Sequence, residues 1–231
     1  MNNSTSYIKK KYMIVYENSS RRINNFYSTK LDCVSDIELF PAIDTINYYN
    51  KYSKIAFDKK YCTGGYIDKM ETFSPGKLGC NLSHQSLYRK IAENPNLNDN
   101  DWILIMEDDL EFLIPNTPPN FENMVREVME IDPQTNFLRG YTFPIFMRSQ
   151  FQFWNCIGNP SIYEEIDQWG TQCYLIPKHF AKKIAYEVSD RHIDYHLIRM
   201  KKKYEHFYTY KYSKKMITHS DEHSLLENNE Y

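Results

Sequence analysis

The hydrophobic pattern is most distinctive at residues 102–112, where an uninterrupted apolar run leads into three consecutive carboxylates. Trp102 to Met106 leave no polar face, which is typical of a strand covered on both sides of a parallel sheet. Glu107, Asp108 and Asp109 follow directly, and open α/β sheets bind their ligands at the carboxyl ends of the strands. We therefore predict that the functional site lies at this end of the sheet.

Similar apolar runs predict further strands at residues 12–16, 37–43 and 137–141, in the segment CYLIP and in the segment MITH. Helices are predicted after Ser19 or Ser20, from Ser74 to Pro95, over residues 121–131, around residues 180–188 and after Asp194. Residues 150–163 read as an aromatic loop, and residues 164–167 as a polar one. The alternation of strands and helices predicts a three-layer α/β domain with a mostly parallel sheet.

The three carboxylates favour a bound cation. Adjacent carboxylates repel one another and resist entering a partly dry cleft, and a divalent cation removes both costs. In an extended chain Glu107 and Asp109 would face one side and Asp108 the other, as in a D-x-D pair that addresses metal and nucleotide together. Taken alone, the triplet fits a solvated loop entry better.

Two longer segments add context to the triplet. The stretch SPGKLGCNLSHQSLYRKI, followed by WILIMEDDLEF, resembles glycosyltransferase family 25, which includes bacterial lipopolysaccharide β-galactosyltransferases and collagen galactosyltransferases. The family's G-C-x-x-S-H motif is present as Gly79, Cys80, Ser83 and His84. The second half resembles the family's G-T-x-x-Y-L-I and V-D-x-x-L segments, at residues 170–176 and at Asp194. One departure is Thr45, where the family's A-V-D-G segment has glycine.

The resemblance implies an A-type glycosyltransferase fold, which is Rossmann-like, and it implies a role for each candidate residue. The metal, Mn²⁺ or Mg²⁺, would be held by Asp109 and His219. The nucleotide sugar would be bound by Glu107, Asp108, His84, Ser83 and Arg22. The catalytic candidates are Asp194 and Asp167.

The catalytic base is left open between two groups of acidic residues. An inverting transfer needs a carboxylate within reach of the acceptor hydroxyl, on the far side of the sugar from the diphosphate. Glu164, Glu165 and Asp167 lie in the polar loop, where solvent could simply surround them. Asp194 stands at a predicted helix start, where the helix N-terminus keeps a carboxylate ionised. We favour Asp194, although an ordinary first-turn Asp reads the same way.

The predicted function is inverting transfer of a hexose, galactose or glucose, from a UDP-sugar to a hydroxyl of a glycan or glycosylated protein. A role in lipopolysaccharide biosynthesis is part of what the resemblance implies. One alternative is a non-catalytic protein of the same fold that binds UDP-sugar or glycan. A carboxylate-metal phosphodiesterase or nucleotidyltransferase would normally bring a second acidic cluster, and the sequence has none evident.

Length and composition fit a single domain. With 231 residues and 42% hydrophobic residues, the chain can build one sizeable core. We expect a glycosyltransferase domain over residues 1–231, with a flexible tail at 1–10, a nucleotide-binding part at about 11–112 and an acceptor part at about 113–231. The net charge of −2 gives no electrostatic case for a nucleic-acid partner.

The cysteine positions and the hydropathy pattern indicate the cellular compartment in which we expect the protein. Five cysteines at scattered positions predict free thiols in a reducing compartment. The apolar core near the N-terminus is too short for a signal peptide, and no run reaches transmembrane length. We therefore expect a cytoplasmic protein without a transmembrane segment, for which peripheral membrane contact stays open.

Overall fold

The computed structural model describes residues 6–16, 24, 36–45, 75–112, 119–140, 157, 161–165, 170–187, 192–210 and 217–219. Within these ranges the main sheet has seven strands in the order β2-β1-β3-β7-β5-β8-β6. Their bounds are Ile37–Pro41 for β2, Ile8–Val15 for β1, Trp102–Glu107 for β3, Cys173–Pro177 for β7, Phe137–Arg139 for β5, Phe207–Tyr210 for β8 and Ile162–Glu164 for β6. The pairings make β7 and β6 antiparallel to the other five strands, so the sheet is mixed and mostly parallel.

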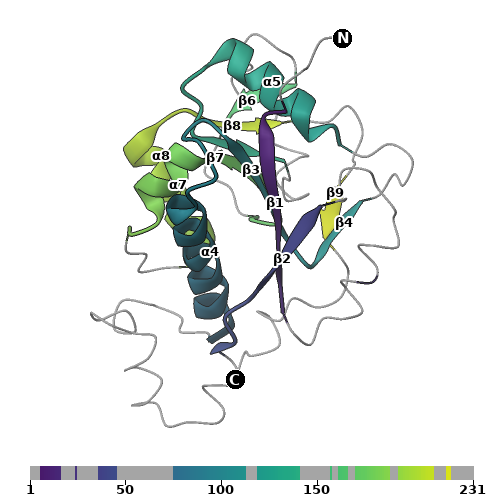
Figure 1. Ribbon diagram of the computed structural model, residues 1–231, viewed down its shortest axis with the longest axis vertical. Helices are drawn as coiled ribbons and strands as arrows, with labels where there is room; N and C mark the ends of the chain where they lie inside the picture. The colour runs from purple at the N-terminus through teal and green to yellow at the C-terminus, as the bar shows by residue number, and fades with distance from the viewer. Residues whose placement is uncertain are drawn as a thin grey trace, which may run out of the picture.

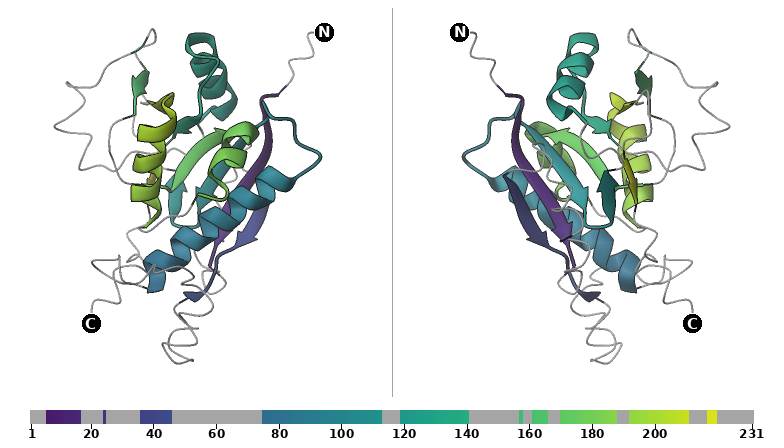
Figure 2. Two further views of the ribbon diagram at one scale, coloured as in Figure 1. Left: turned by 90° about the vertical axis from the view of Figure 1, so that its left-hand side faces the viewer. Right: turned by 90° about the vertical axis from the view of Figure 1, so that its right-hand side faces the viewer.

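Helices cover both faces of this sheet (Figure 1). Helices α4 (Pro75–Glu93), α7 (Lys178–Ile184) and α8 (Ile193–Tyr204) contribute to one buried cluster, with Ile103 and Ile105 of β3. Helix α5 (Phe121–Ile131) contributes to the other, with Leu104 and Met106. Figure 2 shows α4 running obliquely across its face of the sheet. The predicted three-layer α/β architecture is confirmed, and the apolar run of β3 is buried because both layers cover it.

The first strand begins earlier than the hydrophobic pattern predicted. β1 starts at Ile8, so residues 8–10 belong to the sheet although they were expected in a flexible tail. Ile8 pairs with Trp102, and the Trp102 amide donates to the Tyr7 carbonyl at 3.0 Å. Because backbone pairing with β3 does not depend on side-chain polarity, the polar run Lys9 to Lys11 joins the strand.

The start of α4 is pinned to the chain that follows β2. A Cβ atom on Gly79 would lie 2.5 Å from Thr45 Oγ1 and 2.7 Å from the Ile43 carbonyl oxygen, so only glycine allows this approach. One turn later the Ser83 hydroxyl donates to the Gly79 carbonyl at 2.6 Å and accepts from the Ile43 amide at 2.8 Å. The helix ends at Glu93, two residues before Pro95, as predicted.

A second, two-stranded sheet stands beside the main one. β4 (Leu110–Phe112) pairs antiparallel with β9 (Ile217–His219), and Figure 1 shows both at one side of the molecule. The strand predicted in MITH is confirmed. Its register places His219 opposite Leu110, the residue after Asp109.

The polar loop predicted at residues 164–167 is wrong where the structure describes it. Glu164 ends β6, and Glu165 is buried, where its carboxylate pairs with Arg139 Nε at 2.7 Å and accepts from the Thr209 hydroxyl. The side chains of Arg139 and Glu165 are only 2% and 3% exposed. A buried pair of this kind cannot be recognised from an isolated acidic residue, and it gives Glu165 a structural role.

Replacing Arg139 with Met should lower the free energy of unfolding by about 3–5 kcal/mol, because the Glu165 carboxylate would stay buried without its cation. Urea denaturation measures this loss. The matched control is Lys182→Met, which removes the exposed pair with Asp99 and should cost about 1 kcal/mol or less. Equal losses in the two variants would contradict the structural role of Glu165.

Two further expectations concern cysteines and membranes. Within the described residues neither Cys80 nor Cys173 forms a disulfide, which agrees with the prediction for these two, and Cys33, Cys62 and Cys156 lie outside the described residues. None of the helices in the described ranges combines the length and apolar character needed to cross a bilayer.

Candidate active site

The three carboxylates stand where the hydrophobic pattern placed them, at the carboxyl end of β3. Their local conformation differs from the extended chain that was predicted. Glu107 is the last residue of β3, and Asp108 and Asp109 form a turn into β4. The Asp108 amide makes a last bond to β1, donating to the Ile14 carbonyl at 3.1 Å, and β4 then pairs with β9 in a separate sheet.

Asp108 joins the ends of β3 and β1. Its Oδ2 accepts from the Tyr16 amide at 2.9 Å, and its side chain is largely buried. The Tyr16 hydroxyl in turn donates to Asp44 Oδ2 at 3.1 Å, beyond the end of β2. Three neighbouring strands therefore deliver polar groups to one edge of the sheet, which is where open α/β sheets bind ligands.

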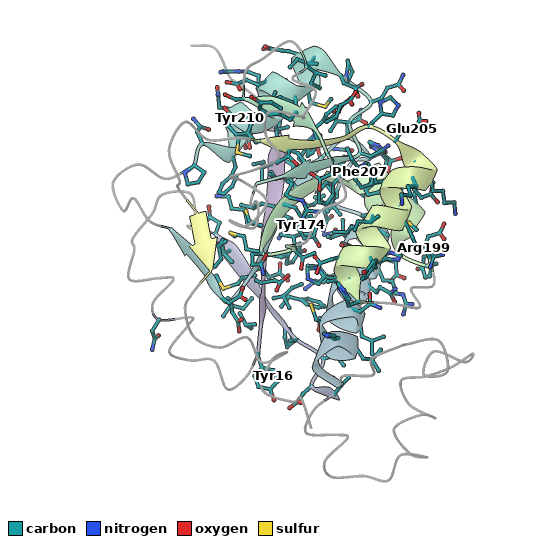
Figure 3. The ribbon with its side chains drawn as sticks, turned by 180° about the vertical axis from the view of Figure 1, so that it is seen from behind. Tyr16, Tyr174, Arg199, Glu205, Phe207 and Tyr210 are labelled. Carbon is teal, nitrogen blue, oxygen red and sulfur yellow. The ribbon has the colours of Figure 1, made fainter. Side chains whose placement is uncertain are left out.

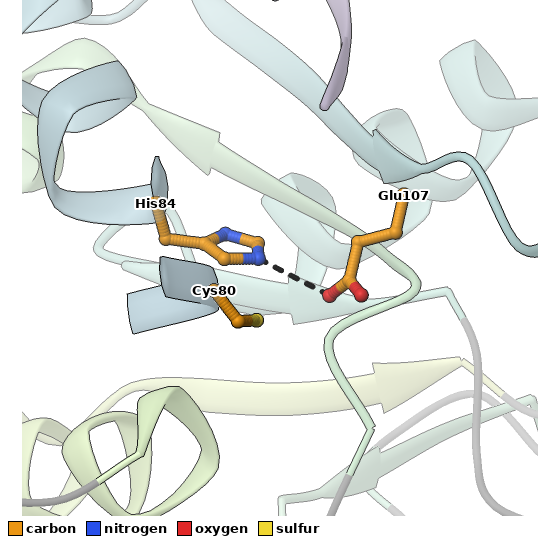
Figure 4. A group of neighbouring side chains, drawn as sticks. All are labelled: Cys80, His84 and Glu107. Atoms are coloured by element: carbon orange, nitrogen blue, oxygen red, sulfur yellow. Dashed lines mark hydrogen bonds and ion pairs between the residues drawn. The ribbon is translucent and has the colours of Figure 1, made fainter. Parts of the chain in front are cut away.

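Glu107 points the other way, toward α4. Its Oε1 lies 3.1 Å from His84 Nε2, as drawn in Figure 4, and its side chain is 18% exposed. His84 Nδ1 lies 2.7 Å from the Tyr174 hydroxyl, which lies 2.7 Å from the Tyr88 hydroxyl. Figure 3 shows Tyr174 among interior side chains.

One direction of this chain of hydrogen bonds runs from Tyr174 through His84 to Glu107. Burial raises the pKa of Tyr174 well above its usual range, so its hydroxyl keeps a proton to donate. If Tyr174 donates to His84 Nδ1, then Nε2 carries the imidazole proton and faces the Glu107 carboxylate. Nothing local in the sequence signals Tyr88 or Tyr174 as parts of the site. His84 and Glu107, in contrast, were both predicted and are brought together.

Ser83 does not share this placement. Its side chain is buried, and its hydroxyl serves the Gly79 carbonyl and the Ile43 amide. Ser83 therefore has a structural role, which is to hold α4 against the chain after β2, and the nucleotide-binding role expected for it stays a prediction.

Asp194 lies in the first turn of α8 and is tied to the segment that enters β7. Its Oδ1 accepts from the Gly170 amide at 2.8 Å, and its Oδ2 lies 3.2 Å from His192 Nδ1. Gly170 has φ 113°, a conformation that other residues rarely adopt. Two residues later, the Gln172 carbonyl accepts from the Glu107 amide at 3.0 Å. The segment 170–172 thus connects Asp194 to the end of β3.

Cys80 reports how much negative charge gathers here. Burial raises the pKa of its thiol well above the usual range, and four carboxylates raise it further, those of Glu107, Asp194, Asp109 and Asp108. Asp194 of α8 is thus in the neighbourhood of the carboxylates at the end of β3, in agreement with its link to that strand through the segment 170–172.

The last three candidates are His219, Arg22 and Asp167, of which the structure places only the backbone of His219. The register of β9 sets the backbone of His219 beside the turn that carries Asp109. Arg22 and Asp167 lie outside the described residues.

A separate cavity of about 540 Å³ opens at the other end of the strands. Ser6, Ile8, Asp36 and Glu122 are among its lining residues. Since Ile8 pairs with the first residue of β3, this cavity lies at the opposite end of the sheet from the carboxylates.

Comparison with known proteins decides the family. The family model described as "Glycosyltransferase family 25 (LPS biosynthesis protein)" matches residues 8–195. The chain belongs to glycosyltransferase family 25. The matched range contains both motifs of α4 and β3 as well as Asp194, and it stops before His219.

The individual proteins that resemble this chain share little sequence identity with it. A glycosyltransferase 25 family member from Aedes aegypti is 26% identical over 187 residues, which cover 76% of this chain and 28% of that protein. The chain therefore spans little more than a quarter of the length of this relative. Among solved structures, mouse xyloside xylosyltransferase 1 in its apo form matches with a TM-score of 0.35 and 14% identity, over 84% of this chain and 62% of that one.

Proposed function

We propose that this family 25 protein is an inverting glycosyltransferase that moves galactose or glucose from a UDP-sugar to a hydroxyl of a glycan or glycosylated protein. The observation that carries the proposal is the placement of Glu107, Asp108 and Asp109 at the carboxyl end of β3, beside the segment 170–172 to which Asp194 is bonded. Family membership supports glycosyl transfer, and the family's association with lipopolysaccharide biosynthesis supports a lipopolysaccharide glycan as acceptor.

A divalent cation, Mn²⁺ or Mg²⁺, fits the donor set of this site. Carboxylate oxygens are the ligands that these ions prefer, and Glu107, Asp108 and Asp109 place three carboxylates in succession at the end of β3. Asp109 would hold the ion, with His219 as an added ligand from β9. The ion would neutralise charge that develops on the UDP leaving group.

The remaining groups act on the substrates directly. Asp108, fixed by the Tyr16 amide, and Glu107, fixed by His84, would bind the ribose or water on the nucleotide side. Asp194 would accept the proton of the acceptor hydroxyl as that oxygen attacks the anomeric carbon from the face opposite the diphosphate. Its bond to Gly170 holds the carboxylate in place for this step.

A panel of nucleotide sugars tests the donor class. UDP-galactose or UDP-glucose with Mn²⁺ should raise the melting temperature, as a ligand at 100 times its Kd stabilises by about 2.7 kcal/mol. GDP-mannose serves as the control and should leave the melting temperature unchanged. Slow release of UDP and free sugar from the stabilising donor would establish turnover. Stable binding without any release would favour a non-catalytic binding protein of the same fold.

A further inference from the structure

Cys80, which the proposed function does not use, adds a third kind of ligand atom to the pair formed by His84 and Glu107. A sulfur, an imidazole nitrogen and a carboxylate oxygen lie within 4.8 Å of one another. Figure 4 shows the three side chains converging, the first two from α4 and the third from the end of β3. We propose that they form a binding site for a thiophilic divalent transition-metal ion such as Zn²⁺, distinct from the carboxylate site at Asp109.

The backbone presents these groups in a fixed arrangement. Cys80 and His84 are four residues apart in α4 and therefore lie on one face of the helix. Their two neighbours, Gly79 and Ser83, hold the same turn against Ile43. The helix cannot rotate without breaking those contacts, so little ordering is needed when an ion binds.

The donor set selects the kind of ion. Thiolate and imidazole ligands suit Zn²⁺ and similar ions, whereas Mg²⁺ and Mn²⁺ prefer oxygen. A typical zinc site has Zn–N and Zn–O distances near 2.0–2.2 Å and a Zn–S distance near 2.3 Å. The three ligand atoms lie within 4.8 Å of one another. Small side-chain rotations would therefore bring all three to these distances from one ion. A water molecule can complete four ligands.

The surroundings supply the support that metal-bound histidines normally have. A ligating imidazole usually donates its second ring N–H to a fixed acceptor, which orients the ring. The Tyr174 hydroxyl lies at the proper distance from His84 Nδ1, 2.7 Å, and Tyr88 orients that hydroxyl in turn. With the ion bound, His84 Nδ1 would donate to Tyr174 while Nε2 binds the metal.

Charge also balances at this site. Thiolate and carboxylate together neutralise a divalent ion, and the Cys80 proton leaves to solvent as the sulfur–metal bond forms. The His84–Glu107 hydrogen bond is exchanged for two bonds to the ion. Asp108, Asp109 and Asp194 add negative potential that attracts cations to this edge of the sheet. The inference goes beyond the proposed glycosyl transfer and does not depend on it.

Titration of the whole chain with Co²⁺ under argon tests the proposal. One equivalent should produce a thiolate-to-Co²⁺ charge-transfer band in the near ultraviolet, and Zn²⁺ should abolish it. Cys80→Ala should lose the band. Cys173→Ala is the matched control and should keep it, because Cys173 lies in β7 among apolar core residues. Circular dichroism shows whether each variant is folded.

Two further variants test the site without replacing the cysteine. Tyr174→Phe should keep the band but weaken Co²⁺ binding by roughly 10–100-fold, the usual effect of removing such a supporting group. Asp109→Asn should keep the band, which separates this site from the one in the proposed function. The proposal is overturned by absence of the band in the unmodified protein, by its persistence in Cys80→Ala, or by its loss in Asp109→Asn.

Discussion

Replacing Asp109 with Asn is expected to abolish Mn²⁺-dependent UDP binding and to lower turnover by roughly three orders of magnitude. A metal ion that neutralises a leaving group contributes several kcal/mol to the transition state, and each 1.4 kcal/mol is a factor of ten. The fold should survive because Asp109 lies in a turn and Asn has nearly the same shape. Isothermal titration with UDP, in Mn²⁺ and in EDTA, measures the binding.

Glu130→Gln is the matched control for this variant, since it removes an exposed carboxylate of α5. It should bind UDP and turn over donor like the unmodified protein. If UDP binds the unmodified protein equally well in EDTA, the assignment of a metal to Asp109 is wrong.

Asp194→Asn should lower turnover by roughly two to four orders of magnitude, the usual contribution of a general base. UDP-sugar affinity should stay nearly unchanged, because the variant leaves the β3 turn intact. The amide oxygen of Asn can still accept from the Gly170 amide, so the contact between α8 and the entry to β7 is retained. Steady-state kinetics with a saturating donor measure the effect.

Two further variants decide which group takes the proton. His192→Gln should have a smaller effect than Asp194→Asn, since His192 would act by orienting the Asp194 carboxylate, which lies 3.2 Å from its Nδ1. An equal loss would indicate that the pair works as a unit with the imidazole as the base. Asp167→Asn should turn over normally, and a large loss there combined with an active Asp194→Asn variant would move the role to Asp167.

Sequence alone identified the elements whose burial follows from local periodicity. The unbroken apolar run of β3 can only be satisfied between two layers, and the stripe of Phe121, Met124, Val125 and Val128 requires a helix with one buried face. Proline gave the bounds of α4, because Pro75 favours a helix start and Pro95 prevents continuation. The position of the carboxylates at the end of β3 followed directly from these elements.

Tertiary structure decided which of those elements meet. β7 lies antiparallel between β3 and β5, and this insertion brings Tyr174 to His84 and Gly170 to Asp194. The buried pair of Arg139 and Glu165 likewise joins β5 to the end of β6. Such contacts link residues far apart in the chain, and their energies depend on the packing of the whole sheet. Local patterns record only whether a side chain is buried. The partner that a buried polar group finds is therefore set by the assembled fold.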